Sequence, residues 1–341
     1  MNKEVDLSKY QIRTDLAIDE LEEKIKLKGV KSKYKEIDSI KVTEVTLEEK
    51  NELGKKKGNY ITLEFDDITD SSNANKVMKV LTTELNKILK IVKDSYGLVV
   101  GLGNNKSTPD SLGPLTINNI IVTNHIYIMD KLSDNYKRLS AINPGVMGET
   151  GIETSDIIES IVKKIKPDYL IVIDSLASKS IERLNKTIQI TNTGIHPGSG
   201  IGNRRKEISY ETLGIPVIAI GVPTVVDAAV IVSNTINFIY KNYEFNKKYI
   251  SNPKSKLTFN NVNYLNEKIA ENPEEKKKLL GLVGTLNEEE LEVFIYEVLN
   301  PVGYNFMVTP KEIDFIIDKL SSIISDSINK VIHGIDKNYK R

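Results

Sequence analysis

The sequence predicts an α/β protein built on a mostly parallel sheet with helices on both faces. Two nearly continuous apolar runs, at residues 168–174 and 215–222, have the composition of strands that are buried on both faces. Segments with a helical spacing of apolar residues alternate with these runs along the chain. Because parallel neighbours in a sheet are joined by crossovers, this alternation indicates a sheet that helices cover on both sides.

Local patterns predict the other elements of the first two thirds of the chain. Residues 61–65 alternate in hydrophobicity as a strand does, and residues 98–100 are apolar throughout. We expect a long amphipathic helix around residues 77–92, a strand at 119–128 and a helix at about 155–166. In sheets of this kind, functional groups gather beyond the carboxyl ends of the strands.

The ends of the chain are less regular. A helix is expected at about 225–240, and a final helix with one broad apolar face at about 311–332. Residues 241–280 are charged and rich in Asn, which predicts an inserted surface segment or small subdomain. Residues 1–60 are rich in Lys and Glu with little pattern, and 48–58 are interpreted as a solvated loop or hairpin.

Composition limits the class of protein. Lys and Arg together number 47, as do Asp and Glu, and the resulting net charge of zero argues against a general binder of nucleic acid or acidic membranes. The absence of Cys excludes disulfides, thiolate catalysis and Cys-ligated metals, and it fits a reducing compartment. No signal peptide or membrane-spanning run is visible, so we expect a cytoplasmic protein.

Three loops are predicted beyond strand ends, and each contains an aspartate. Asp110 lies in the glycine-rich loop 101–114, Asp174 ends the first apolar run, and Asp227 follows the second. A carboxylate at such a position can serve an active site, but Asp is also a favoured residue at turns and helix N-caps. From the residues alone both interpretations stay open for Asp110 and Asp174, whereas a capping role is favoured for Asp227.

A polar stretch at residues 191–207 is interpreted as a flexible loop that faces the substrate. His196 could carry a proton there, and Ser199 and Arg204 are further candidates for substrate contact. The stretch has neither a Walker pattern nor GxGxxG in a strand-to-helix context, which disfavours a nucleotide site. The Ser-Lys pair that begins at Ser178 has poor geometry for a nucleophile and its base, because adjacent residues on a helix point in different directions.

Long stretches in the middle of the chain carry a family resemblance. They include TPDSLGP, AINPGVMGETGIETSDII, IDSLASKSIERLN, TIQITNTGIHPGSGIGNRRKE and GIPVIAIGVPTVVDA. The chain here resembles the germination proteases of spore-forming bacteria, endopeptidases that degrade small acid-soluble spore proteins. The likeness covers most of residues 96–230 and parts of both ends, and such long runs are far more specific than a short motif.

The resemblance implies a fold like that of the hydrogenase maturation endopeptidases, an α/β sandwich with a twisted sheet. It also implies two essential aspartates, which match Asp110 and Asp174. Two neighbouring carboxylates share one proton, so one of them could activate water while the other protonates the scissile carbonyl. Backbone and amide groups could then donate to the developing oxyanion, and the candidates are Gly101, Gly103 and Asn104.

Alternatives to this mechanism remain open. The two aspartates and His196 could instead hold a divalent metal ion, since acidic residues contact a metal in the related maturation enzymes. We prefer the metal-free carboxylate pair and therefore expect no cofactor. A non-catalytic protein of the same fold that binds spore proteins is a further alternative. The resemblance also implies a homotetramer in the forespore and spore core, with no nucleic acid or membrane partner.

The N-terminus suggests a self-processing zymogen. Residues 13–20, RTDLAIDE, place an acid before the bond between Asp15 and Leu16, and Ala and a second acid after it. This is similar to the site that the family recognises in spore proteins. We therefore expect a propeptide of residues 1–15, removed by cleavage after Asp15, followed by a single peptidase domain over residues 16–341.

Overall fold

The computed structural model describes residues 15–21, 27–53, 55–89, 94–133, 135–198, 206–250, 272–299 and 306–335. The chain divides into two compact units. The larger unit consists of Arg13–Ser178, Glu182–Val225 and Thr309–Arg341, and the smaller unit consists of Met1–Ile12, Lys179–Ile181 and Val226–Val308. The candidate site lies in the larger unit.

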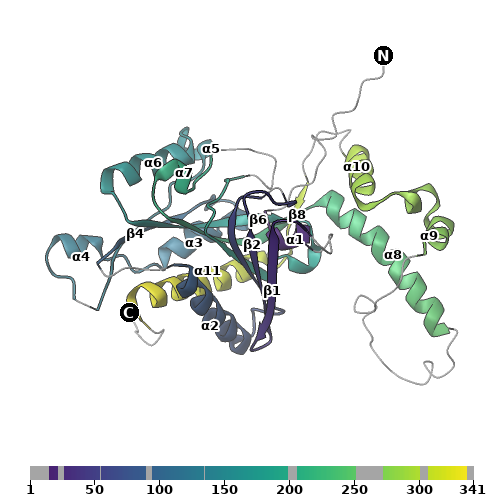
Figure 1. The fold of residues 1–341 in the computed structure, drawn as a ribbon, viewed down its shortest axis with the longest axis horizontal. Helices are drawn as coiled ribbons and strands as arrows, with labels where there is room; N and C mark the ends of the chain where they lie inside the picture. The colour runs from purple at the N-terminus through teal and green to yellow at the C-terminus, as the bar shows by residue number, and fades with distance from the viewer. Residues whose placement is uncertain are drawn as a thin grey trace, which may run out of the picture. The chain divides into compact units, whose positions relative to one another are not determined.

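The larger unit combines a sheet with helices (Figure 1). Its strands are β1 (Val30–Ile37), β2 (Ile40–Leu47), β3 (Gly58–Glu64), β4 (Tyr96–Gly101), β5 (Arg138–Ile142), β6 (Tyr169–Ser178), β7 (Thr187–Thr191) and the greater part of β8 (Val217–Asp227). Its helices are α1 (Ala17–Leu21), α2 (Ser71–Ile88), α3 (Leu112–Asn118), α4 (Asn124–Ile128), α5 (Met147–Thr150), α6 (Thr154–Ile165), α7 (Tyr210–Leu213) and α11 (Ile313–His333). Short 3-10 turns are η2 (Thr108–Asp110) and η3 (Ile181–Arg183).

The sheet has two parts that differ in strand direction. The strands lie in the order β1-β2-β3-β7-β8-β6-β4-β5. In the part formed by β4, β5 and β6, the parallel part below, β4 pairs in parallel with both neighbours. In the part formed by β1, β2, β3, β7 and β8, the antiparallel part, successive neighbours run in opposite directions. The predicted α/β class is confirmed, with a sheet that is mixed rather than mostly parallel.

Helices cover both faces of this sheet, as predicted. Apolar residues of α2 and α11 pack on one side, here called the first face, against alternate strand residues such as Val99, Ile171 and Ile190. Residues of α6 pack on the opposite side, the second face, against the intervening residues Leu98 and Leu170 and their neighbours. Because side chains alternate along a strand, each central strand buries an apolar row on both faces, which explains the continuous apolar runs.

Outside the candidate site, the structure of this unit differs from the sequence prediction at residues 119–128 and contains strands before the predicted loop or hairpin at 48–58. The predicted strand at 119–128 is instead the end of α3, a turn and the helix α4, and the strand that follows is β5. A short apolar run fits either element, and here the Thr123 hydroxyl ties the turn to the backbone of Lys137 and Leu139. The Lys- and Glu-rich N-terminal region contains the hairpin β1–β2, whose strands are linked by the ion pair of Lys35 with Glu44 at 2.5 Å.

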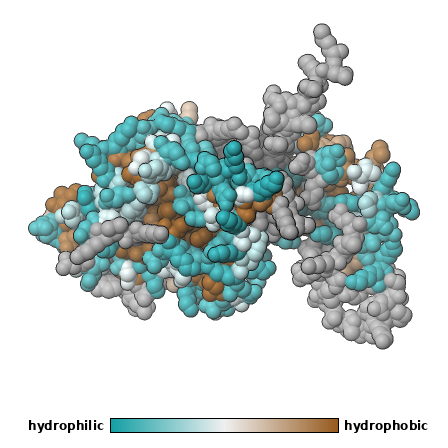
Figure 2. Space-filling model, viewed as in Figure 1, coloured by the Kyte–Doolittle hydropathy of each residue, from teal (hydrophilic) through white to brown (hydrophobic). Residues whose placement is uncertain are grey.

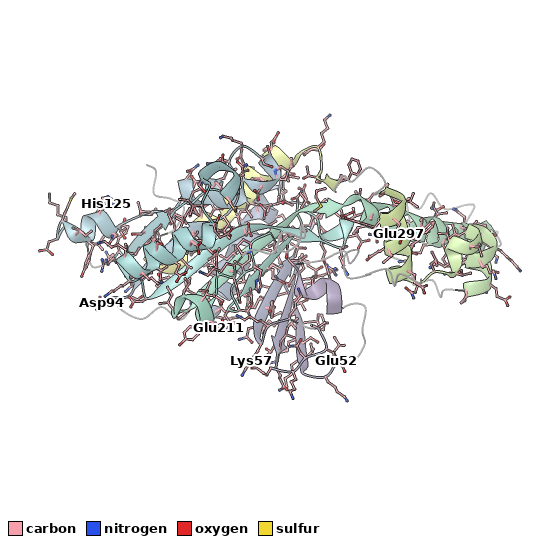
Figure 3. The ribbon with its side chains drawn as sticks, turned by 90° about the horizontal axis from the view of Figure 1, so that it is seen from above. Glu52, Lys57, Asp94, His125, Glu211 and Glu297 are labelled. Carbon is pink, nitrogen blue, oxygen red and sulfur yellow. The ribbon has the colours of Figure 1, made fainter. Side chains whose placement is uncertain are left out.

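Figure 3 shows the side chains of the larger unit from above, and four of its labelled residues mark opposite sides of the sheet. Glu52 and Lys57 lie on the side of the N-terminal hairpin, whereas Asp94 and His125 lie on the side of β4 and α4. Hydrophobic side chains are exposed over α4 (Figure 2), where Ile128 and Met129 are largely open to solvent. Among the described residues, none of the helices has the length and apolar character that a membrane span requires.

The smaller unit is mainly helical. It contains α8 (Ala228–Ile250), α9 (Pro273–Leu280), the 3-10 turn η7 (Gly281–Thr285), α10 (Glu288–Leu299) and β9 (Met307–Val308). β9 pairs with Val226 and Asp227 at the end of β8. The helix predicted at 225–240 therefore begins at Ala228 and continues ten residues further than expected, to Ile250. Residues 251–271 of the predicted surface segment lie outside the described residues.

Candidate functional site

Asp174 lies inside β6 and not beyond its end. The strand continues to Ser178, so the predicted strand end at Asp174 was wrong, and the segment that follows is the 3-10 turn η3 rather than a capped α-helix. By the alternation of the strand, Asp174 shares the second face of the sheet with Leu170, Val172 and Leu176. The residue is only 7% exposed, and its Oδ1 accepts a hydrogen bond of 2.9 Å from the backbone N–H of Ser175.

Asp110 lies in the glycine-rich loop that follows β4. β4 ends at Gly101, which stands opposite Ile173 in the parallel register, and the next N–H, of Leu102, donates to the Ile173 carbonyl at 2.8 Å. The loop then folds back, and the N–H of Asn104 donates to the carbonyl of Asp110 at 2.9 Å. Asp110 is the last residue of η2, which contacts β6. The parallel register and this contact thus place the loop that contains Asp110 beside β6, the strand that contains Asp174.

The glycines of this loop are required by close packing. Gly103 has a φ of +114°, and a Cβ there would lie 2.0 Å from the carbonyl oxygen of Asp110 and 3.1 Å from its Oδ1. A Cβ on Gly101 would lie 2.4 Å from the carbonyl oxygen of Gly113. Gly103 therefore lies directly beside the Asp110 carboxylate. The N–H of Asn104 is already used within the loop, which leaves its side-chain amide as its remaining donor.

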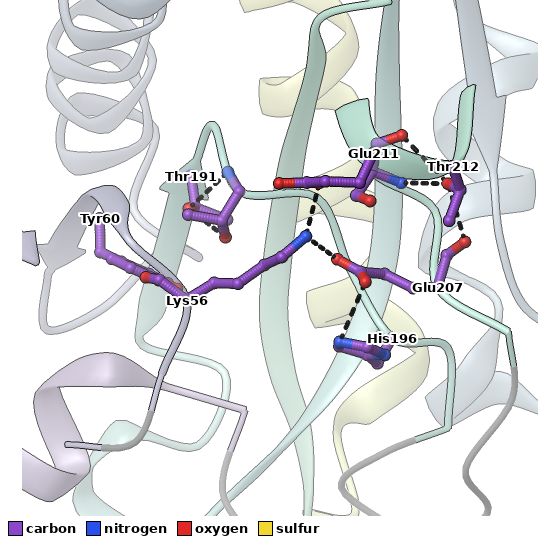
Figure 4. Close-up of polar contacts among 9 residues, drawn as sticks. Lys56, Tyr60, Thr191, His196, Glu207, Glu211 and Thr212 are labelled. Carbon is purple, nitrogen blue, oxygen red and sulfur yellow. Dashed lines mark hydrogen bonds and ion pairs between the residues drawn. The ribbon is translucent and has the colours of Figure 1, made fainter. Parts of the chain in front are cut away.

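His196 belongs to a different polar cluster. Its Nε2 lies 3.8 Å from Glu207 Oε2, and its side chain is 55% exposed (Figure 4). Lys56 pairs with the same Glu207 and, at 2.6 Å, with Glu211. Ser199 and Arg204 lie outside the described residues. Within the described ranges no three His, Asp or Glu side chains are grouped as metal ligands would be.

Asp227 behaves as the capping interpretation predicts. It is the last residue of β8, and its Oδ1 accepts a hydrogen bond of 2.7 Å from the N–H of Ala229 at the start of α8. Burial raises the pKa of this carboxyl above its ordinary value, and the hydrogen bond to Ala229 opposes that shift. The residue lies in the smaller unit, at the junction of a strand and a helix.

The N-terminal segment, residues 15–21, lies on the second face of the sheet. Leu16 is fully buried and packs with Ile18, Leu176 and Ile195. Ala17, at the start of α1, packs in a second apolar cluster against β2 and β3. Leu176 is two residues beyond Asp174 on the same face, a distance of about 7 Å along a strand. The peptide bond between Asp15 and Leu16 therefore lies on the same face as Asp174.

Polar contacts hold both ends of this segment. The N–H of Asp15 donates to the carbonyl of Ala177 at 3.4 Å, and the N–H of Ala177 donates to Asp15 Oδ2 at 3.1 Å. Asp19 forms a 2.6 Å ion pair with Arg183, and their side chains are only 1% and 8% exposed. Asp19 also accepts a hydrogen bond of 3.3 Å from the Ser178 hydroxyl. A buried charge pair of this kind holds the two groups in one geometry.

Gln189 contacts the first residues of the segment, and no functional role was predicted for it from the sequence. It lies in β7 between Ile188 and Ile190, whose side chains enter the core of the first face, so its own side chain points to the second face. Its amide contacts Asp15 and Ala17. A single amide inside an apolar strand was the available signal, since the other described residues of β7 are Thr and Ile.

Comparison with known proteins places the chain in a family. The model of the family described as germination protease matches residues 8–340. This chain belongs to the germination protease family. It is 48% identical to the germination protease of Geobacillus sp. (strain WCH70), with 98% of this chain and 96% of the relative covered. It is 47% identical to the germination protease of Priestia megaterium and 46% identical to that of Bacillus cereus, with the same coverage.

Membership in the family makes the chain a peptidase, a hydrolase that cuts peptide bonds. Among solved structures, a NiFe hydrogenase maturation protease from Thermococcus kodakarensis KOD1 matches 41% of this chain and 80% of its own. The identity is 16% and the TM-score is 0.27, so this likeness adds no argument about the chemistry of the site.

Proposed function

We propose that this member of the family is an endopeptidase that begins the degradation of small acid-soluble spore proteins, with Asp110 and Asp174 as its catalytic pair. The observation that carries the proposal is the pairing of Gly101 with Ile173, because Gly101 begins the loop that contains Asp110 and Ile173 is followed by Asp174. The packing of Gly103 against Asp110 supports a fixed position for that carboxylate.

In the proposed reaction the two carboxylates divide the work of acid and base. One ionised carboxylate takes a proton from water, whose oxygen attacks the scissile carbonyl carbon. The protonated partner donates its proton to the carbonyl oxygen, which gives a tetrahedral intermediate with two hydroxyl groups. This intermediate collapses as the first carboxylate gives the proton from water to the peptide nitrogen, the C–N bond breaks, and one hydroxyl returns its proton to the partner. Like charges held close together leave one proton on the pair, which supplies the two forms at once.

The proposal includes synthesis as a zymogen that cuts itself between Asp15 and Leu16. Residues 15–19 support it, because they occupy the face next to Asp174 as a bound peptide would. Leu16 packs among apolar side chains, and Asp19, the fourth residue after the proposed cut, pairs with Arg183. A short tether raises the local concentration of such a segment to the order of millimolar, so even a weakly binding sequence would block the face.

The proposal extends to assembly and location. We propose a homotetramer that acts in the cytoplasm of the developing forespore and in the spore core. The exposed apolar residues over α4 support an interface between subunits, since large apolar side chains in one patch commonly mark contact surfaces. Light scattering on the purified chain measures this directly, and a mass equal to one chain would contradict it.

The test of the activity uses the full chain. After incubation in mild acid, N-terminal sequencing should give Leu16-Ala17-Ile18, and the processed protein should then fragment small acid-soluble spore proteins, as mass spectrometry would show. A full-length chain that already digests these proteins at the full rate would contradict the zymogen. A processed chain that leaves them intact would contradict the proposed substrate.

A further inference from the structure

The side-chain amide of Gln189 bonds to the backbone on both sides of one peptide bond. Its Nε2–H donates to the carbonyl oxygen of Asp15 at 3.2 Å, and its Oε1 accepts from the N–H of Ala17 at 2.8 Å. The bond between Asp15 and Leu16 lies between these two contacts. Gln189 itself is only 5% exposed, so neighbouring atoms of the sheet fix its position.

The orientation of the amide follows from its partners. A backbone N–H can only donate and a carbonyl can only accept, so the oxygen of the amide must face Ala17 and the nitrogen must face Asp15. A neutral amide is suited to this arrangement because it offers one donor and one acceptor side by side. It bonds to backbone groups alone, which every peptide residue except proline presents.

We infer that Gln189 is a substrate-binding residue of the peptidase, which holds the scissile peptide by its backbone and donates a hydrogen bond to the carbonyl that is attacked. The inference rests on the proposed self-processing, in which Asp15–Leu16 is the bond that is cut. In a substrate protein the same amide would bind the carbonyl before the cut and the N–H of the second residue after it. Gln189 would thus bind a substrate through backbone groups alone and would not select for particular side chains.

The location of Gln189 agrees with this role. It stands on β7, which is separated from β6 by β8, and its register partner on β8 is Gly221. Gly221 has no side chain, and a Cβ there would meet Leu176 at 2.3 Å. The segment therefore spans from Ala177 on β6 to Gln189 on β7 across a strand that presents only backbone at this position.

A donor on the scissile carbonyl has a defined chemical effect. Negative charge develops on that oxygen when water attacks, and the hydrogen bond strengthens as the charge grows. Removing one such donor in other hydrolases lowers the rate about 100-fold to 1,000-fold. A purely structural role is the competing interpretation, in which Gln189 caps the first N–H of α1 and only holds the segment in place.

The experiment measures cutting of the Asp15–Leu16 bond in the full chain at several pH values, with two changes at Gln189. Gln189→Met keeps the size of the side chain and removes both hydrogen bonds. Gln189→Glu keeps an acceptor for Ala17 and can donate to Asp15 only when it is protonated. Thr187→Val is the matched control, because Thr187 is buried on the same strand and face and its hydroxyl has no hydrogen-bond partner among the described residues.

We expect Gln189→Met to lower the rate of cutting about 100-fold and Thr187→Val to leave it unchanged. The rate of Gln189→Glu relative to the wild type should rise as the pH falls, because protonation restores the donor. Protection of the Ala17 amide from hydrogen exchange, measured at neutral pH, should persist in Gln189→Glu and be lost in Gln189→Met. Hydrogen exchange of the Ala17 amide thus measures whether the segment is docked, independently of the rate at which the bond is cut.

Two results would overturn the inference alone: cutting of Gln189→Met at the wild-type rate, or a ratio of Gln189→Glu to wild type that stays constant across the pH range. The constant ratio is the result that a helix cap would give. A wild-type chain that never cuts at Asp15–Leu16 would overturn both the proposed self-processing and the role of Gln189 in it. The failure of the two proposals is thus distinguishable.

Discussion

The parallel and antiparallel parts of the sheet contribute different groups to the site. In the parallel part, Asp110 lies in the loop that follows β4, and Asp174 lies inside β6 on the second face. In the antiparallel part, Gln189 projects from the middle of a strand, on the flat second face, and contacts the backbone of the N-terminal segment. The proposed acid and base therefore come from a loop and a strand of the parallel part, whereas the peptide is bound along a strand of the antiparallel part.

The difference follows from how the two arrangements expose polar groups. Beyond parallel strands the chain turns into loops, where a carboxylate can approach a substrate without breaking the ladder of the sheet. A strand face in the antiparallel part is regular, so it can hold an extended segment at a fixed register. Changes at the two aspartates should therefore affect chemistry, whereas a change at Gln189 should affect both the docking of the segment and the rate of cutting.

The largest effect is expected at the two aspartates. Asp110→Asn and Asp174→Asn should each abolish cutting of the Asp15–Leu16 bond and of spore proteins, because Asn is nearly isosteric but cannot exchange a proton. Circular dichroism should show an unchanged fold, and the amide of Ala17 should remain protected from hydrogen exchange. Near-normal turnover in both single variants would remove the carboxylate pair from the mechanism.

The next effect concerns the buried ion pair of Asp19 and Arg183. Arg183→Met leaves the carboxylate of Asp19 buried without this partner, and breaking such a pair costs about 3–5 kcal/mol. Hydrogen exchange in residues 16–19 should accelerate by about 150-fold to 5,000-fold, because the segment can leave the face without global unfolding. The double variant with Asp19→Ala should recover much of the protection. Equal protection in the single variant and the wild type would show that the pair does not hold the segment.

A smaller effect is expected at the edge of the parallel part, where His333 ends α11. The N–H of Lys137 donates to its Nδ1 at 3.2 Å and its Nε2 lies 3.0 Å from the Ile121 carbonyl, so the ring is neutral with a proton on Nε2. Burial lowers the pKa of His333 below its ordinary value of 6.5. The unfolded chain therefore binds a proton before the folded chain does.

The sign of the effect on stability follows from this difference. The contribution of His333 is complete above pH 6.5 and is lost as the pH falls from 6.5 toward the lower pKa of the folded state. Thermal unfolding at pH 7.5 and pH 5 should show a larger decrease in Tm for the wild type than for His333→Gln. An equal decrease in both would contradict the assignment.

No effect is expected from metal removal if the carboxylate pair acts alone. Exhaustive chelation should leave the rate of cutting unchanged, and elemental analysis should find no stoichiometric divalent ion. Loss of activity that one divalent metal restores would favour the alternative in which Asp110 and Asp174 are metal ligands.

Much of the fold could be predicted because apolar patterns were strong where strands are buried. The runs at 168–174 and 215–222 identified β6 and β8, yet both strands extend several residues beyond them. In β6 the extension beyond Asp174 includes Ser175 and Ser178, polar residues that a hydropathy pattern assigns to a loop. The hairpin β1–β2 was missed because Lys and Glu on an exposed edge strand resemble a solvated loop.

Residues of the candidate site could be predicted from the sequence only where a loop pattern surrounded them. Asp110 was marked by the glycines around it, and the family resemblance then paired it with Asp174. Gln189 and Arg183 were not found, because their roles depend on a segment more than 160 residues away in the chain that covers them in three dimensions. No local pattern contains such a contact.

The complete burial of Leu16 has a consequence for the direction of processing. Hydrolysis at the proposed bond would create a new α-amino group on Leu16, with an ordinary pKa of about 8, and in acid it would carry a full positive charge. A cation among Leu176, Ile18 and Ile195 loses its hydration at a cost of several kcal/mol. The cut would thus turn an apolar anchor into a buried charge, so that the product expels itself and the enzyme cannot return to its latent form.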